Sequence, residues 1–451
     1  MKKFIILSLI CLLGYTSVYS EDFEEIEEIP REKRFTIALA EVMASNIVAW
    51  SYSRYLREDN YSFLISWKTV EFNLRHGFEW DPNNFGTNFL NHPYQGSTYY
   101  NAARTNGFNF WESIPFTFGG SMMWEIFMES EFPSYNDIIT TTWGGIALGE
   151  ALFRFSEQVL DDRSRGGERF LREFSGFLIN PVGGFNRLIN GEMFQHTSTV
   201  NHMRKSVEGY LALGGSGRVS GGGLEEKGNG GAFEVTMHYG QPFQYKEKRK
   251  PFDYFTFRLW TSRADTTRNF SILTRAFLAG KNLEGNNNQK HLWGLFQHFD
   301  YIDLDVFKIG GVAFAGGILS YFSLGKGFEL VTGPALGLMP LAAGDNEYVT
   351  SYQGRNYNYG WGYKGRLDLL LRHTKFGEFF VDYNYWFIST REGAPGVDRL
   401  HLLNATYRIP VWKKLGLGAE YSYYLRNANY DNDPDVRREI SAIRALIFYS
   451  F

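Results

Sequence analysis

The sequence predicts a transmembrane antiparallel β-barrel of about twelve strands, preceded by a helical domain that acts as a plug or periplasmic cap. Three observations support this fold class: an apolar leader, a change of apolar period near residue 205, and a terminal strand that ends on an aromatic residue. Residues 444–451 place apolar side chains at every second position and finish on Phe451, as expected of a strand with one face toward lipid. We therefore expect the outer membrane of a Gram-negative bacterium.

Residues 1–20 predict a signal peptide, because Lys2 and Lys3 precede an apolar run and small residues follow it. Cys11, the only cysteine of the chain, lies within the leader. Once the leader is removed the chain has no thiol, which suits the oxidising periplasm. Beyond the leader no stretch reaches the roughly 18 uncharged apolar residues of a membrane-spanning helix; residues 35–50 come closest. The net charge of -3 and the lack of a basic stripe indicate no nucleic-acid partner.

An acidic stretch, 21–35, predicts a flexible linker, with a docking tail as the alternative. Apolar residues then recur at helical spacing through a helical domain, 36–195. Helices are expected near residues 37–47, 63–74, 111–128, 136–160, 168–178 and 184–189.

From residue 205 to 451 the period becomes two, and the clearest segment is 414–426, where Leu417 and Tyr421 alternate with Gly418 and Glu420. One face of such a strand meets lipid and the other is polar. We count twelve strands, at residues 205–219, 231–241, 252–263, 268–281, 289–302, 305–321, 327–341, 357–373, 376–390, 398–410, 414–428 and 437–451.

The polar face of these strands predicts which charged side chains line the lumen. Opposite charges recur on neighbouring strands, so the set can form a paired network that fills a narrow barrel or can line a channel in a wider one. The residues predicted to line the lumen include Arg366, Asp368, Arg372, Glu378, Asp382, Arg408, Glu420, Arg426 and Arg444.

Six blocks of the helical domain form a recognisable pattern in a fixed order. They are His92-Pro-Tyr-Gln-Gly-Ser-Thr-Tyr-Tyr-Asn-Ala-Ala-Arg104, Phe110-Trp-Glu-Ser-Ile-Pro-Phe116, Gly120-Ser-Met-Met-Trp-Glu125, Pro133-Ser-Tyr-Asn-Asp137, Gly144-Gly-Ile-Ala-Leu-Gly-Glu150 and Asn180-Pro-Val-Gly-Gly-Phe-Asn-Arg187. These blocks resemble one bacterial family, catalogued as domain of unknown function 3943. The resemblance covers residues 75–195 closely and the barrel only in pattern. It implies an outer-membrane location and no established activity.

The candidate catalytic residues are His92, Glu112, Glu125, Asp137 and Glu150, because each lies among apolar neighbours where an unpaired charge is costly. If they converge, the histidine could act as a general base oriented by a carboxylate, or several of the five could hold a divalent cation. The alternative is a hydrogen-bonded network that locks the helices together. No motif indicates a cofactor or a bound metal.

Two functions remain open on the sequence alone. The first is a plugged or gated barrel with a structural or transport role for small solutes or lipids. The second is an enzyme that modifies envelope lipid or glycan, with its site in the helical domain. The expected partners are outer-membrane lipid and the barrel-assembly machinery, which would recognise the C-terminal strand ending at Phe451.

Overall fold

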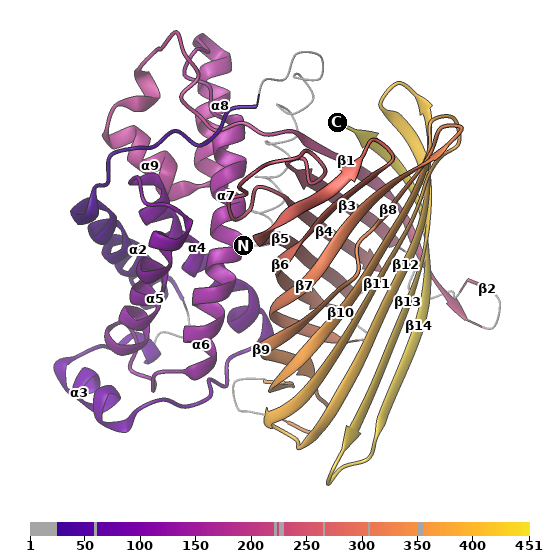
Figure 1. Cartoon of the computed structure of the whole chain (residues 1–451). Coiled ribbons are helices and arrows are strands. Elements are labelled where there is room, and N and C mark those ends of the chain that lie inside the picture. Colours follow the sequence, from indigo (N-terminus) through magenta and orange to yellow (C-terminus); the bar gives the residue numbers. More distant parts are fainter. Residues whose placement is uncertain are drawn as a thin grey trace. The chain divides into compact units, whose positions relative to one another are not determined.

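The computed structural model describes residues 25–57, 61–220, 223–224, 230–264, 267–304, 307–349 and 355–451, so the predicted signal peptide lies outside it. The chain divides into two compact units, one ending at Lys205 and one spanning Ser206–Phe451. We call them the helical unit and the barrel, and Figure 1 shows both.

The helical unit is built around α4, whose side chains are buried on nearly every face. Gly96 of α4 meets Gly145 at the start of α7, and a Cβ on Gly96 would lie 1.9 Å from the Thr141 carbonyl oxygen. Only glycine allows two helix backbones to approach this closely. The helices are α2 (Phe35–Leu56), α3 (Trp67–His76), α4 (His92–Thr105), α5 (Phe110–Phe127), α6 (Tyr135–Ile139), α7 (Gly145–Val159), α8 (Gly166–Ile179) and α9 (Pro181–Ile189).

Of the predicted linker, residues 25–34 lie against the helical unit and are held there by ion pairs. Arg31 Nη2 lies 2.9 Å from Glu157 Oε2, and Lys33 Nζ lies 2.7 Å from Glu112 Oε1. Glu28 accepts from the buried guanidinium of Arg104 at 2.7 Å. Opposite charges on the helices therefore bind a segment whose composition alone suggests a solvated chain.

Among the described residues, a ring of twelve antiparallel strands closes the barrel, as predicted. The short β8 and β9 together occupy one position of the ring, because both pair with β7 and with β10. The two-residue β2 pairs only with β1 and lies outside the ring. The strands are β1 (Val207–Ser220), β2 (Gly223–Leu224), β3 (Gly230–Tyr239), β4 (Phe255–Ala264), β5 (Thr267–Asn286), β6 (Gln289–Asp303), β7 (Lys308–Gly325), β8 (Phe328–Thr332), β9 (Ala335–Asp345), β10 (Tyr357–His373), β11 (Gly377–Glu392), β12 (Gly396–Trp412), β13 (Leu415–Tyr430) and β14 (Val436–Ser450).

The last strand closes the ring by pairing with the first, in a register that joins Tyr210 to Ser450. Phe451 extends this pairing, since its N–H donates to the Gly209 carbonyl at 3.0 Å. Side chains alternate as expected: Leu417 is 54% exposed on the outer face, whereas Glu420 is 2% exposed inside.

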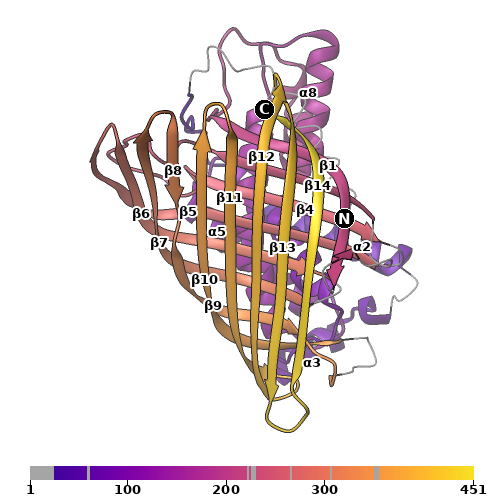
Figure 2. The same ribbon diagram turned by 90° about the vertical axis from the view of Figure 1, so that its right-hand side faces the viewer.

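Charged side chains fill the barrel interior and meet across it. Arg258 of β4 lies 2.9 Å from Glu234 of β3 and 2.9 Å from Glu420 of β13. Its Nη1 also lies 3.7 Å from Asp382 Oδ2 of β11. On one side β5, β6, β7, β8/β9 and β10 separate β4 from β11, and on the other β12, β13, β14, β1 and β3 do. This contact therefore joins opposite walls, and Figure 2 shows β11–β14 crossing the strands of the other wall.

The other residues predicted to line the lumen are also paired. Arg275 Nη1 of β5 lies 2.6 Å from Asp368 Oδ2, and Arg366 Nε lies 2.8 Å from Asp368 Oδ1. Lys364 of β10 lies 2.7 Å from Asp300 of β6. Further ion pairs join Arg408 to Glu378, Arg426 to Asp398, and Arg444 to Glu420. Arg372 differs, because it lies near the end of β10 with half of its side chain exposed and pairs with Glu378.

Replacing Glu420 by glutamine should destabilise the barrel by roughly 3–5 kcal/mol, because Arg258 and Arg444 would keep buried charges with one anionic partner fewer. The matched control is Glu439→Gln, which breaks an exposed pair with Arg437 and should cost at most about 1 kcal/mol. The loss of the compact folded band on unheated gels, followed against urea concentration, measures both. Equal shifts for the two variants would contradict the prediction.

Candidate functional site

The structure brings His92, Glu125 and Asp137 together inside the helical unit, with Asp81 and Glu129 beside them. His92 begins α4, Glu125 lies in the last turns of α5, and Asp137 lies in α6. The side chains of His92 and Asp137 approach to 3.7 Å between Nε2 and Oδ1. We call these five residues the acid–histidine cluster.

Two loops hold the cluster in place through backbone hydrogen bonds. Residues 79 and 134 form a parallel bridge, which brings the Asp81 N–H to the Asn136 side-chain oxygen at 2.8 Å. The side-chain amide of Asn136 donates to Asp137 Oδ1 at 2.8 Å. The Ser134 N–H donates to Glu125 Oε2 at 2.8 Å. The second oxygen of Glu125, Oε1, is buried without a hydrogen-bond partner.

Two wide helical turns flank the cluster. The π-helical turn η2 (Thr87–Asn91) ends at His92, and η3 (Thr140–Gly144) follows α6 and separates it from α7. Such turns insert an extra residue into a helix and are frequent at functional sites. Here η3 interrupts the stretch 136–160, for which the sequence predicts one continuous helix.

Burial sets the protonation of the cluster. It raises the pKa of Asp81 to about 7, helped by the charge of Asp137, and it raises the pKa of Asp137 to about 7. Burial and the charge of Asp137 also raise the pKa of Glu125 and of Glu129 well above the usual range. The pKa of His92 falls to about 4, because burial outweighs the charge of Asp81. Near neutral pH the site therefore combines a neutral imidazole with carboxyl groups that can donate protons.

This arrangement can perform general acid–base chemistry, in which a neutral imidazole accepts a proton and a neighbouring carboxyl group supplies one. Among the residues that the structure describes, no three histidine, cysteine or acidic side chains are arranged to hold a metal ion.

The other two candidate catalytic residues lie elsewhere. Glu112 is at the surface, where it completes the capping box of α5 by accepting from the Asn109 N–H at 3.0 Å. Glu150 is fully buried, and its carboxylate accepts from Arg104 Nε and Arg154 Nε at 2.7 Å each. Tyr100 donates to it as well, at 2.9 Å. A carboxylate paired with two guanidinium groups stabilises the packing of α4 on α7.

Asp81 and Glu129 were not among the candidate residues predicted from the sequence. Glu129 follows Glu125 by four residues, the spacing of neighbours on one helix face, so this signal was available. Asp81 lies in an Asp-Pro-Asn-Asn stretch that is also typical of an ordinary turn, and only the pairing of residues 79 and 134 reveals its place.

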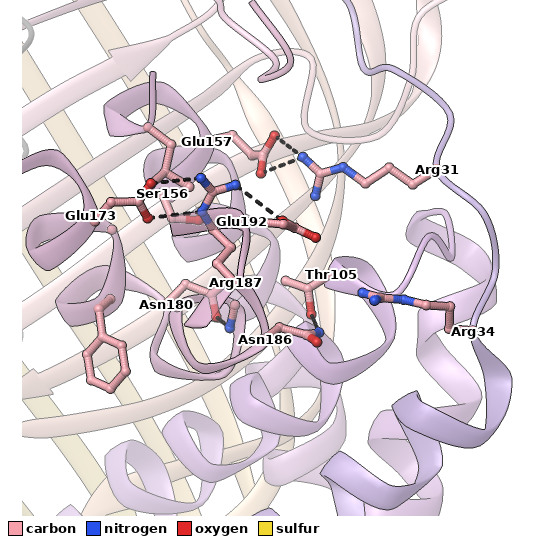
Figure 3. A pocket seen from close by; sticks show the side chains of 15 residues that line it. Arg31, Arg34, Thr105, Ser156, Glu157, Glu173, Asn180, Asn186, Arg187 and Glu192 are labelled. Atoms are coloured by element: carbon pink, nitrogen blue, oxygen red, sulfur yellow. Dashed lines mark hydrogen bonds and ion pairs between the residues drawn. The ribbon is translucent and has the colours of Figure 1, made fainter. Parts of the chain in front are cut away.

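A small polar pocket lies elsewhere in the helical unit, between the N-terminal segment and helices α7, α8 and α9 (Figure 3). Arg187 points into it and pairs with Glu173 at 2.7 Å and with Glu192 at 3.4 Å. Burial opposes the ionisation of Glu157, but Arg31 and His202 outweigh it and hold the pKa of Glu157 below its usual range. Arg31 and Arg187, which line the pocket, are thus both paired with carboxylates.

The fold and this site define a closed twelve-strand antiparallel barrel joined to a helical unit with a buried acid–histidine cluster. Residues 77–182, which contain the whole cluster, match the family described as Domain of unknown function (DUF3943). The match confirms the resemblance that the sequence blocks predicted. None of the curated proteins matches the chain.

Several solved structures are similar to the chain at low identity. The outer membrane channel DcaP of Acinetobacter baumannii is 8% identical, and the match covers 54% of this chain and 96% of DcaP with a TM-score of 0.23. The KdgM porin is 9% identical over 54% of this chain and 99% of the porin, with a TM-score of 0.23. A mutant of the TodX monoaromatic hydrocarbon channel is 10% identical over 57% and 93%, with a TM-score of 0.24.

Replacing Asp137 by asparagine should flatten the pH dependence of the helical unit. A carboxyl group whose folded pKa is raised from 3.8 to about 7 contributes stability that is fully present below pH 4 and is lost as the pH rises through 7. Burial lowers the pKa of His92 to about 4, so the stability that this histidine contributes rises with pH. The variant retains this contribution. Near pH 8 the variant should be more stable than the wild type by on the order of 1 kcal/mol.

Thermal unfolding in detergent, followed by the helical circular-dichroism band between about pH 5 and pH 8, measures this difference. The exposed Glu112→Gln is the control and should follow the wild-type curve. Parallel curves for wild type and Asp137→Asn would show that the buried carboxyl does not titrate in this range.

Proposed function

We propose that this protein is an outer-membrane barrel with a structural role, whose filled lumen does not conduct and which anchors the helical unit to the membrane. The observation that carries the proposal is the contact of Arg258 with Asp382 across opposite walls. Breaking a paired, buried network of charges costs several kcal/mol. A solute could pass along the barrel axis only if this network were broken, at that cost in free energy.

The outer face of the barrel supports the membrane location. Large apolar side chains such as Leu336, Leu338 and Ile447 remain 60–67% exposed there, which is costly in water and favourable in lipid. Assembly would then depend on the C-terminal strand β14, and the barrel-assembly machinery is the partner that we propose for it.

Ion current through planar bilayers tests the structural role. The wild-type chain, with its insertion verified by flotation with lipid vesicles, should give no stepwise current, because ion pairs bridge the walls. Discrete current steps from the inserted wild type would instead support the gated barrel for small solutes or lipids.

The acid–histidine cluster favours a second candidate function, an enzyme that modifies envelope lipid or glycan. Its support is the convergence of His92 with Asp137 at 3.7 Å and of Asp137 with Glu125, in protonation states suited to proton transfer.

Lipid and glycan profiles of cells that carry His92→Ala or Glu125→Gln test the enzyme. Both variants should change the same envelope component, because each removes a proton-transferring group, while Glu112→Gln should leave it unchanged. Assembly of the barrel is the control: in every strain the barrel should be accessible at the cell surface and should change its gel mobility on heating. Profiles identical to wild type in both cluster variants would contradict an enzymatic role.

A further inference from the structure

The hairpin of α8 and α9 has the reverse of the polarity expected for a surface in water. Its inward side carries Arg172, Glu173, Asn186 and Arg187, all less than 9% exposed. Its outward side carries large apolar residues, of which Phe170 and Ile189 are each 67% exposed. The outward set is Phe170, Leu171, Phe174, Phe185, Leu188 and Ile189.

Strong contacts hold the polar residues inside, so the orientation of the hairpin is fixed. Arg187 donates to Glu173 Oε1 and to Asp162 Oδ1, each at 2.7 Å, as Figure 3 shows for the first pair. Turning the apolar face inward would break these buried pairs. A helix in water normally buries its apolar stripe and exposes its charges, and this hairpin does the opposite.

Helix α2 repeats the pattern over a greater length. Three of its four buried residues are the small or polar Ala38, Asn46 and Ser53, and the fourth is Val42. Val48 and Leu56, in contrast, are 68% and 74% exposed. Small and polar residues at helix contacts are typical of helices packed within lipid. By length and composition, α2 is the one helix among the described residues that could cross a membrane, and its 22 residues extend for about 33 Å.

Basic residues stand at both ends of α2, with Arg34 before its first turn and Arg57 after its last. Arginines at such positions can reach the phosphate groups of lipids while the apolar residues between them lie among acyl chains. This charge distribution fits a phospholipid bilayer better than a second protein, whose docking would not need cations at both ends of one apolar helix.

We propose that the apolar outer faces of α2, α8 and α9 contact the acyl chains of a phospholipid bilayer. The inference rests on the proposed membrane location of the barrel and extends it to the helical unit. The lipid-facing surface then includes helices as well as strands, and the acid–histidine cluster lies within a unit that has direct access to lipid.

Single cysteines test the proposal in a chain whose own Cys11 is replaced by serine. Phe174→Cys and Val48→Cys report on the outer faces of α8 and α2, Leu417→Cys is the barrel's lipid-facing reference, and the exposed Ser198→Cys is the aqueous reference. Each variant is labelled with a small fluorophore after reconstitution into phosphatidylcholine vesicles. Emission is measured with doxyl-labelled lipid and, separately, with iodide.

Quenching of the α8 and α2 labels by doxyl lipid to the extent seen at Leu417, with iodide quenching well below that at Ser198, is the expected result. Iodide quenching like that at Ser198 would overturn the proposal, because water would cover these faces. Protection from both quenchers would also overturn it, in favour of cover by protein. If the Leu417 label itself escaped doxyl quenching, the membrane location of the barrel would fail instead.

Discussion

The ion pairs around Arg258 are the interaction on which the barrel depends. This guanidinium contacts carboxylates from β3, β11 and β13, which lie at three separate positions of the strand ring. Charges removed from water must be paired, so the opposite walls have to stay within reach of one another. The filling of the interior by side chains of the barrel's own strands follows from this requirement.

The sequence could predict the barrel because each strand carries its own signal. Alternation along 414–426 identifies both the strand and its inward side without reference to any other strand. The partners of Arg258 could not be predicted, because they depend on which strands face one another across the closed ring. The interruption between β8 and β9, at Gly333 and Pro334, was also missed, since proline there leaves the alternation on both sides intact.

The helical unit was predicted less completely, for a physical reason. Helix α4 is central and buried on nearly every face, so it has no apolar stripe and no helix was predicted there. Glu150 and Glu125 both lie among apolar residues, yet two arginines neutralise the first, whereas acidic groups surround the second. Only tertiary structure distinguishes a paired buried carboxylate from a protonated one.

Both units bury charged side chains and expose apolar ones, the barrel with strands and the helical unit with helices. In the barrel, Glu420 is buried among arginines while Leu417 is exposed; in the helical unit, Glu173 is buried against Arg187 while Phe174 is exposed. If water surrounded both units, each would expose the wrong side chains, and the cost would grow with every apolar residue. A lipid environment removes that cost for strands and helices alike, which is why we treat the exposed apolar helices as evidence about solvent. The buried acid–histidine cluster then fits the same account, because low-polarity surroundings favour the neutral forms of its carboxyl groups and imidazole.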